Sequence, residues 1–276
     1  MMQSSENQQA LSSPKLLENL YSGRNVEGEV LVTDHIFSYI LSGSQEVWVG
    51  DKQYSFKAGD YRFFKRNQLT KYIKRTGADG FRSIAIHIDQ YTLKEISQEY
   101  ALKSSGHYQG DGVKLLNHNS FLRNFVDSLE PYLRNRKMDK EILHLKTKEL
   151  VLILADADPD LKEMLFEFSD PGKLDLEAFM NGHYRYNVPL ERFAFLTGRS
   201  LSGFKRDFEK LFQITPGRWL VQKRLTEARH LIEQQLQRPA QVYLDLGFVN
   251  MSHFFYAYKK AFGKAPSHKI NLKNKK

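Results

Sequence analysis

The hydrophobic residues follow a strand-like pattern in the first part of the chain and a helical pattern in the rest. From about Val26 to Ile88, short runs rich in Val, Ile, Tyr and Phe are separated by single glycines. Short strands at this spacing are typical of a small antiparallel barrel or sandwich. After Tyr91 the apolar residues recur with the period of a helix. The sequence therefore predicts an α+β protein that begins with an antiparallel β-barrel.

Two apolar stripes with helical spacing follow the predicted barrel: Leu122, Val126, Leu129 and Leu133 in the first, and Ile142, Leu145 and Leu152 in the second. Apolar helices outside a barrel commonly cap it or form a dimer interface, so we expect residues 114–155 to carry dimerisation. Two prolines and several aspartates between 156 and 173 then indicate a boundary. The predicted parts are a flexible arm (1–17), a barrel-and-helix domain (18–158), a linker (159–173) and a helical domain (174–276).

The helical domain contains a repeat with an offset of fifty residues. It pairs identical or similar residues: Pro189 with Pro239, Leu196 with Leu246, Ser202 with Ser252, Phe204 with Phe254, and Phe208 with Tyr258. Each copy predicts a short helix, a turn containing glycine and a second helix with an apolar i, i+4, i+8 stripe. This is the plan of a helix-turn-helix, whose second helix enters the major groove. Two such units predict a protein that reads double-stranded DNA.

A long helix is predicted between the two units. Thr215 and Pro216 provide a helix start, with Thr as N-cap and Pro at the first helical position. A helix of about 20 residues spans ~30 Å. We expect this length to separate the two units by about one turn of DNA, ~34 Å, so that both second helices can enter major-groove segments on the same face.

The charge of the chain is concentrated in its C-terminal part. The formal net charge is +9, but residues 171–276 hold 19 Lys and Arg against 8 Asp and Glu, whereas residues 1–170 hold 22 against 24. A basic domain joined to a near-neutral one is the expected footprint of a nucleic-acid-binding domain on a different kind of module. Charge alone also fits a protein that binds nucleic acid without sequence preference, and this alternative stays open.

The C-terminal third resembles the AraC family of bacterial transcription regulators. The residues that carry the resemblance are LTGRSLSGFKRDFEKLFQITPGRWL, then KRLTEARHLI, then DLGFVNMSHFFYAYKKAFGKAP, within residues 174–270. The barrel followed by two helices is similar in layout to the cupin-like regulatory domain of the family. The resemblance implies a DNA-binding domain of two helix-turn-helix units, and a regulatory domain that senses a signal.

The resemblance also implies which side chains contact DNA. In the first unit it places base contacts at Ser202, Lys205 and Arg206, and Arg and Lys suit guanine O6 and N7. The corresponding candidates for base contacts in the second unit are Ser252, His253 and Tyr256, and those for backbone contacts are Arg199, Lys210, Lys259 and Lys260.

The second unit departs from the family pattern at two positions. Tyr256 stands where the family commonly carries Arg, so we expect this unit to read sequence weakly. Leu244 stands where Ala194 lies in the first copy, which suggests a slightly shifted helix. On the helix between the units, we interpret Arg224 as a structural ion-pair partner in preference to a DNA contact.

Enzymatic chemistry finds little support in the sequence. The chain has no cysteine, and none of the motifs G-x-x-x-x-G-K-[ST], G-x-G-x-x-G or G-x-S-x-G is present. The nine histidines are scattered, with His35 and His87 each alone in the barrel region. We therefore expect no catalytic residues, no metal and no cofactor. A barrel-fold enzyme with a DNA-binding domain remains the alternative.

The signal that the first domain senses is not evident from the sequence. Tyr39, Trp48, Tyr54 and Phe63 are candidates to line a ligand pocket, although alternating aromatics on strands are also ordinary core residues. The effector is expected to be either a small molecule or a regulatory protein. The sequence has no membrane span or secretory signal, so we expect a cytoplasmic protein. From the resemblance we expect a homodimeric transcription activator that works with RNA polymerase.

Overall fold

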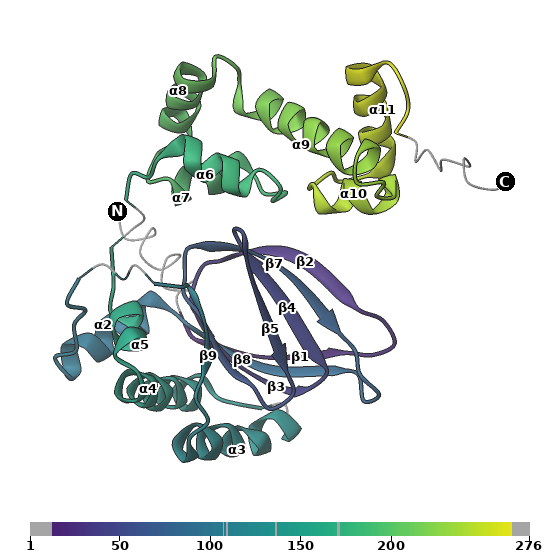
Figure 1. The fold of residues 1–276 in the computed structure, drawn as a ribbon. Helices are drawn as coiled ribbons and strands as arrows, with labels where there is room; N and C mark the ends of the chain where they lie inside the picture. The colour runs from purple at the N-terminus through teal and green to yellow at the C-terminus, as the bar shows by residue number, and fades with distance from the viewer. Residues whose placement is uncertain (1–12, 107, 109, 136, 170–171, 267–276) are drawn as a thin grey trace. The chain divides into compact units, whose positions relative to one another are not determined.

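Two antiparallel sheets form the first part of the chain in the computed structural model, which describes residues 13–106, 108, 110–135, 137–169 and 172–266 (Figure 1). The first sheet has the order β1-β8-β3-β6-β9, with β1 (Lys15–Tyr21), β8 (Phe81–Ile88), β3 (His35–Ser42), β6 (Tyr61–Phe64) and β9 (Val113–Leu116). The second has the order β2-β7-β4-β5, with β2 (Val26–Val32), β7 (Gln68–Arg75), β4 (Ser44–Val49) and β5 (Lys52–Lys57).

The first sheet is buried on both faces, because helices cover one face and the second sheet covers the other. Successive side chains of a strand point to opposite sides and therefore enter different cores. On β3, Phe37 and Tyr39 pack into a core shared with helices, whereas Ile36 and Ile40 pack into the core between the two sheets. The strand has a register irregularity between Ile40 and Ser42, opposite β8. One strand thus contributes to two separate cores.

Four helices come after β8 in the described residues of the first unit: α2 (Gln90–Glu99), which precedes β9, then α3 (Ser120–Asn135), α4 (Lys140–Ala157) and α5 (Pro159–Leu165). The first apolar stripe lies where it was predicted, since Leu122, Val126 and Leu129 of α3 are buried in the core with Phe37. The second stripe was wrong in part. Leu145 of α4 is exposed, and α4 instead buries Thr147, Leu150, Val151 and Leu154.

The chain divides into two units, Met1–Ser169 and Asp170–Lys276. Two predicted boundaries differ from this division. Residues 1–12 of the predicted arm lie outside the described residues, but 15–17 belong to β1, which pairs with β8. The predicted linker, 159–173, begins too early, because α5 buries Leu161, Met164 and Leu165 in the first core.

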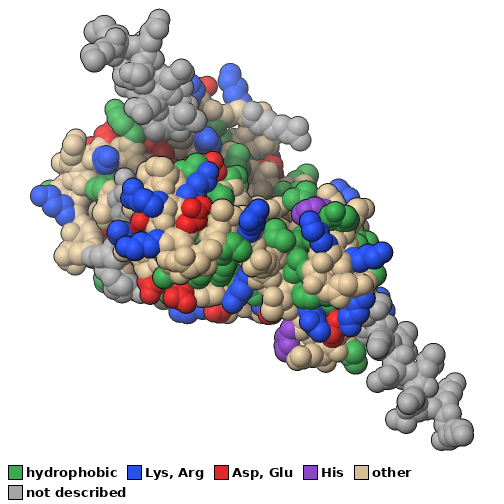
Figure 2. All heavy atoms as spheres, turned by 90° about the horizontal axis from the view of Figure 1, so that it is seen from above, with side chains coloured by type: hydrophobic (Ala, Val, Ile, Leu, Met, Phe, Trp, Pro, Cys, Tyr) green, Lys and Arg blue, Asp and Glu red, His purple; other side chains and the backbone are tan. Residues whose placement is uncertain are grey.

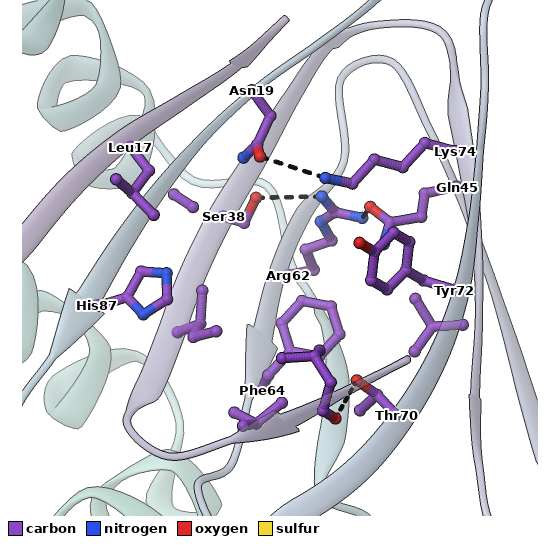
Figure 3. Close-up of a pocket in the computed structure, with 15 residues that line it drawn as sticks. Leu17, Asn19, Ser38, Gln45, Arg62, Phe64, Thr70, Tyr72, Lys74 and His87 are labelled. Carbon is purple, nitrogen blue, oxygen red and sulfur yellow. Dashed lines mark hydrogen bonds between the residues drawn. The ribbon is translucent and has the colours of Figure 1, made fainter. Parts of the chain in front are cut away.

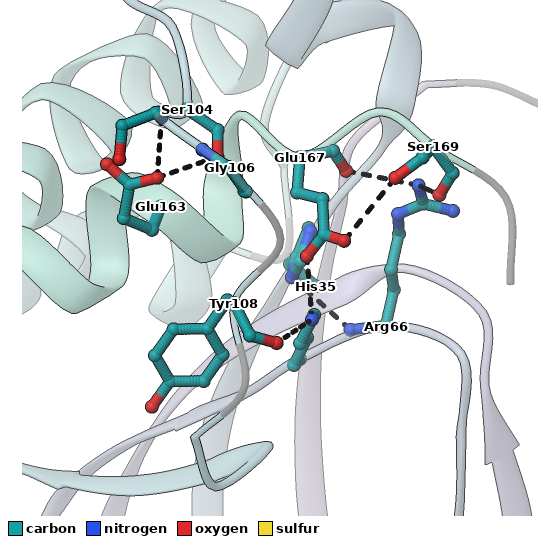
Figure 4. Close-up of polar contacts among 10 residues, drawn as sticks. His35, Arg66, Ser104, Gly106, Tyr108, Glu163, Glu167 and Ser169 are labelled. Carbon is teal, nitrogen blue, oxygen red and sulfur yellow. Dashed lines mark hydrogen bonds and ion pairs between the residues drawn. The ribbon is translucent and has the colours of Figure 1, made fainter. Parts of the chain in front are cut away.

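Polar contacts fix the segment after α5 to the first unit (Figure 4). The Lys65 ammonium pairs with the Glu167 carboxylate at 2.8 Å, and the Arg66 guanidinium donates to the carbonyl oxygens of Glu167 at 3.2 Å and Ser169 at 2.8 Å. The backbone N–H of Arg66 donates to Nδ1 of His35, which is fully buried. Burial, with the charges of Arg66 and Lys65, lowers the His35 pKa well below its usual value. These contacts give His35 a structural role in the first unit.

The second unit consists of six helices among its described residues: α6 (Leu176–His183), α7 (Leu190–Leu196), α8 (Leu201–Phe212), α9 (Pro216–Glu233), α10 (Pro239–Asp245) and α11 (Met251–Phe262). The pairs α7–α8 and α10–α11 are the two predicted helix-turn-helix units, and α9 joins them (Figure 1). With 18 residues, α9 is about 27 Å long.

The repeat changes its offset at the turn. The second helices α8 and α11 correspond at fifty residues, as the sequence indicated. The first helices correspond at forty-nine, because the turn after Gly247 is one residue longer than the turn after Gly198. Leu244 therefore matches Phe195, and the two are 40% and 39% exposed. The predicted pairing of Leu244 with Ala194 was wrong, as were the pairings of Pro189 with Pro239 and Leu196 with Leu246.

Candidate nucleic-acid interface

Helix α8 presents a cationic face opposite its buried face. Ser200 caps the helix by accepting a hydrogen bond from the Gly203 N–H at 3.2 Å. Phe204 and Phe208 are fully buried, which fixes the rotation of the helix about its axis. The predicted DNA contacts Ser202, Lys205, Arg206 and Lys210 are all exposed. The structure thus brings these four side chains together on one helix face, as a recognition helix requires.

Helix α11 repeats this arrangement. The Asn250 side chain caps it by accepting from the His253 N–H at 2.7 Å, and Phe254 and Tyr258 fill the positions of the two buried phenylalanines. The predicted contacts lie on the exposed side: Ser252, His253, Tyr256, Lys259 and Lys260. Figure 2 shows Lys and Arg side chains projecting from the molecular surface with hydrophobic side chains between them.

Exposed apolar residues accompany the second helix-turn-helix, and the sequence reasoning missed them. Val249 and Met251 flank the cap of α11, and both are exposed together with Tyr256. The first helix-turn-helix has Arg199 and Leu201 at the positions of Val249 and Met251. The sequence feature that indicates these residues is the segment FVNM, which places Val and Met beside a helix cap. Apolar side chains at this place can contact the C5-methyl group of thymine.

Arg199 lies in a different environment from the other predicted backbone contacts. Its guanidinium pairs with Asp207 at 3.1 Å and donates to the carbonyl oxygens of Thr197 at 2.7 Å and Leu174 at 3.1 Å. Hydrogen bonding to Arg199 is the main cause that lowers the Asp207 pKa. Only 10% of the Arg199 side chain is exposed, so its surroundings favour a structural role over the predicted phosphate contact.

Arg224 of α9 ties the second helix-turn-helix to the rest of its unit. Its guanidinium donates to the carbonyl oxygens of Tyr184 at 2.7 Å, Gly247 at 2.8 Å and Tyr186 at 2.9 Å. The structural role predicted for Arg224 agrees with its burial and with these three hydrogen bonds to carbonyl oxygens. Arg224 therefore holds the turn between α10 and α11 against the segment after α6.

The C-terminal end of α9 is joined to α11 and the residues after it. The Glu233 carboxylate pairs with Lys264 at 3.0 Å and accepts from the Tyr258 hydroxyl at 3.2 Å. The hydrogen bond from Lys264 is the main cause that lowers the Glu233 pKa, and burial is the main cause that raises the Tyr258 pKa to about 12. Both groups thus keep their native protonation states, carboxylate and phenol, across the neutral pH range.

Gly247 adopts a conformation that other residues rarely take. Its φ is +73°, and a Cβ there would lie 2.3 Å from the carbonyl oxygen of Arg185. We expect Gly247→Ala to destabilise the second unit by about 2 kcal/mol or more, through backbone strain and this clash. The matched control is Gly217→Ala, where nothing lies within 4 Å of an added Cβ. Thermal unfolding of both variants checks this prediction, and equal unfolding temperatures would contradict it.

A cavity of about 200 Å³ lies between the two sheets of the first unit (Figure 3). It is lined by Leu17, Asn19, Val30, Val32, Ile36, Ser38, Gln45, Val47, Arg62, Phe64, Thr70, Tyr72, Lys74, Ala85 and His87. None of the four predicted pocket residues lines it. Tyr39 and Phe63 face the helices, Tyr54 packs at the margin of the inter-sheet core, and Trp48 is one position out of phase with the lining residues of β4.

Among the described residues, no group of three or more His, Cys, Asp and Glu side chains is arranged to hold a metal ion. His35 and His87 lie on the paired strands β3 and β8 but on opposite faces of the sheet, His35 stacked on Phe63 and His87 at the cavity. No helix of the described residues is long and apolar enough to cross a membrane.

Comparison with known protein families finds two matching domains. Residues 35–164 match the ExsA N-terminal regulatory domain, and residues 193–270 match a helix-turn-helix domain. The first match covers most of the strands and helices of the first unit. The second covers both helix-turn-helix units together with α9.

Curated relatives with similar sequences are transcription regulators. The virulence regulon transcriptional activator VirF of Yersinia enterocolitica is 24% identical over 83% of this chain and 86% of its own length. The regulator ExsA of Pseudomonas aeruginosa is 28% identical over 45% of each chain. A solved structure of ToxT from Vibrio cholerae covers 92% of this chain and 96% of its own, with 12% identity and a TM-score of 0.44. The chain belongs to the AraC family of transcriptional regulators.

Proposed function

We propose that this protein activates transcription by binding a specific DNA sequence through α8 and α11. The observation that carries the proposal is the repeated arrangement of a capped helix, two buried aromatics and an exposed polar face. In the first helix-turn-helix that face contains Arg206 and Lys205, which suit the acceptors of guanine in the major groove. Activation follows the relative VirF of Yersinia enterocolitica, which is a transcriptional activator.

The two helix-turn-helix units differ in how they recognise DNA. Helix α8 reads bases through Ser202, Lys205 and Arg206, and Lys210 contacts phosphate. Helix α11 has no Arg on its exposed face, and its candidates for base contacts are Ser252, His253 and Tyr256. We propose that this helix binds mainly through phosphate contacts from Lys259 and Lys260. Its exposed apolar residues add contacts to thymine methyl groups.

The first unit regulates this binding. We propose that the protein acts in the cytoplasm as a homodimer through α3 and α4, which leave Phe121 and Leu145 exposed, and that it contacts RNA polymerase on the promoter. An effector that binds one arrangement of the protomers better than another shifts the population toward that arrangement. The effector is a small molecule or a regulatory protein.

Single substitutions on α8 test the role of each side chain. We expect Arg206→Ala to weaken binding to the selected DNA by about 5- to 150-fold, because a bidentate base contact contributes about 1–3 kcal/mol of discrimination. Lys210→Ala should weaken selected and random duplexes alike and reduce the salt slope of binding by about one. Fluorescence anisotropy at several salt concentrations measures both.

The control for these variants is Lys57→Ala, which removes one exposed positive charge from the first unit. It should leave both affinities unchanged. If Arg206→Ala and Lys210→Ala lower the affinity for selected and random duplexes equally, the assignment of base reading to Arg206 is wrong. The protein would then bind nucleic acid through charge, which is the alternative that its composition leaves open.

A further inference from the structure

Two cationic side chains are buried at the cavity between the sheets. Arg62 comes from β6 and Lys74 from β7, and the two are 3% and 9% exposed. Figure 3 shows their charged ends near each other, one from each sheet. The residues that line the cavity include no Asp or Glu. The cavity therefore carries two positive charges without an acidic residue in its wall.

The partners of Arg62 inside the cavity are neutral. Its Nη1 donates to the Gln45 Oε1 at 2.6 Å, and its Nη2 donates to the Ser38 hydroxyl at 3.2 Å. Its Nε is buried and has no hydrogen-bond partner within the described structure. Phe56 and Phe64 rings lie 5.4 and 5.6 Å from the guanidinium carbon. Arg62 is thus held in position by two of its five N–H groups, and its buried Nε–H is left for another acceptor.

Lys74 is placed in a similar way. Its ammonium donates to the Asn19 Oδ1 at 3.2 Å. The rings of Tyr21, Tyr72 and Phe81 lie 4.9, 5.1 and 5.5 Å from Nζ and provide cation–π contacts. An ammonium group has three donors, of which Asn19 satisfies one. The remaining capacity of Lys74, like that of Arg62, fits an anionic oxygen.

The electrostatics of the cavity agree with this geometry. Burial lowers the pKa of Arg62 to about 9 and, with the charge of Arg62, lowers the pKa of Lys74 to about 8. The charge of Asp60 raises the Arg62 pKa, and its carboxylate accepts from the Lys57 N–H at 2.7 Å. The rings of Tyr21 and Tyr72 are the titratable side chains in contact with the Lys74 ammonium, and His87 lines the same cavity.

Buried charges without an opposite charge are costly to a fold, and an anion in the cavity removes that cost. The rest of the wall is largely apolar: Leu17, Val30, Val32, Ile36, Val47, Phe64 and Ala85. Leu17 and Val30 are partly exposed and mark the opening at β1 and β2. A volume of about 200 Å³ is below the 300–1,000 Å³ typical of pockets for drug-sized ligands. The wall suits a short apolar body attached to an anionic group.

We propose that the cavity between the two sheets binds a small organic carboxylate, with its carboxylate on Arg62 and Lys74 and its apolar body against the aliphatic wall. Binding itself does not depend on DNA recognition. That the carboxylate regulates the protein rests on the proposed function. Such a ligand places one negative charge between the two cations and links the two sheets, since Arg62 and Lys74 come from different sheets.

Calorimetric titration of the full chain with benzoate and hexanoate tests this proposal. Both should bind, whereas the uncharged analogues benzamide and hexanol should bind at least about tenfold more weakly, because hydrogen bonds to charged groups contribute more than neutral ones. Inorganic phosphate should bind more weakly than the two carboxylates, because it leaves the apolar wall uncovered. Equal binding of the neutral analogues, tighter binding of phosphate, or no binding of either carboxylate would overturn the proposal.

Two variants test the site from different directions. Lys74→Met should weaken hexanoate binding by about 10- to 100-fold through loss of a charged hydrogen bond. Val30→Phe places a larger side chain at the opening, leaves both cations in place and should also weaken binding. Lys57→Met, at an exposed lysine, is the matched control and should bind as the unmodified protein does. Circular dichroism confirms that each variant is folded, and unchanged affinity in both site variants would contradict the proposal.

The pH dependence of binding gives an independent readout. The Lys74 pKa is about 8, and a bound anion favours the charged form of Lys74. The protein should therefore take up protons when it binds hexanoate near pH 8. Its affinity should then fall above pH 8 by up to about tenfold per pH unit. In Lys74→Met this fall and the proton uptake should disappear. A pH dependence that persists in Lys74→Met would show that another group is responsible.

Measuring DNA affinity separately distinguishes the two proposals. If hexanoate binds and the protein shows no sequence preference on DNA, the proposed function fails and the ligand site stands. If DNA recognition holds and no carboxylate binds, the ligand site fails alone. Addition of hexanoate should change the affinity for selected DNA in the unmodified protein and leave it unchanged in Lys74→Met; the same change in both would contradict a regulatory role of the cavity.

Discussion

Replacing Arg224 with methionine should destabilise the helical unit by about 3–5 kcal/mol. The substitution keeps an unbranched side chain of similar length but removes the donors to the carbonyl oxygens of Tyr184, Tyr186 and Gly247. Those buried carbonyl groups would lose a charged hydrogen-bond donor, and each such loss is costly.

Denaturant titration monitored by tryptophan fluorescence measures this effect. The chain has two tryptophans, Trp48 in the first unit and Trp219 in the second. In a Trp48→Phe background, the signal reports only on Trp219, which contacts Phe208 and Phe212. Arg218→Met, at an exposed position of the same helix, is the control and should change stability by less than about 0.5 kcal/mol. Equal effects of Arg218→Met and Arg224→Met would refute the structural role of Arg224.

The second large effect is expected from truncating the aromatic anchor of each recognition helix. Phe204 and Phe254 are fully buried at equivalent positions of α8 and α11. Phe204→Ala and Phe254→Ala should each cost about 3–5 kcal/mol of stability by leaving a cavity. Their consequences for DNA should differ. Loss of α8 should remove most sequence preference, whereas loss of α11 should lower affinity for selected and random duplexes together.

Binding of each variant to selected and random duplexes, measured below its unfolding temperature, tests this difference. The ratio of the two affinities should fall toward one for Phe204→Ala and stay near its original value for Phe254→Ala. The opposite pattern would mean that α11, with Tyr256 and its apolar neighbours, reads the sequence. Equal loss of the ratio in both variants would mean that the two units contribute equally to recognition.

The helical unit was predictable because its sequence carries its own internal comparison. Two copies of one pattern show which positions are buried, since Phe204 and Phe254 occupy equivalent places, and the exposed face follows from the helix period. The change of offset was not predictable. A turn that is one residue longer leaves both helices intact, and the chance alignment of Pro189 with Pro239 conceals it.

The ligand cavity was missed for a reason that lies in strand geometry. Sequence alternation separates the two faces of a strand but does not say which face points to which layer. The five-stranded sheet is buried on both sides, so Phe63 and Phe64 look alike in the sequence. Only the topology shows that Phe64 faces the cavity and Phe63 the helices. Buried Arg62 and Lys74 resembled surface cations, because their burial depends on two sheets packing together.

Selection of bound fragments from a pool of random duplexes, with purified protein at physiological salt, tests the central claim most directly. The account predicts that the recovered sequences share two short elements about one helical turn apart, with the element read by α8 more strongly specified than the other. Arg206→Ala should relax one position of the stronger element and leave the spacing unchanged. Recovery of duplexes without any shared sequence, by both the unmodified protein and its complex with hexanoate, would contradict the claim that this protein reads DNA sequence.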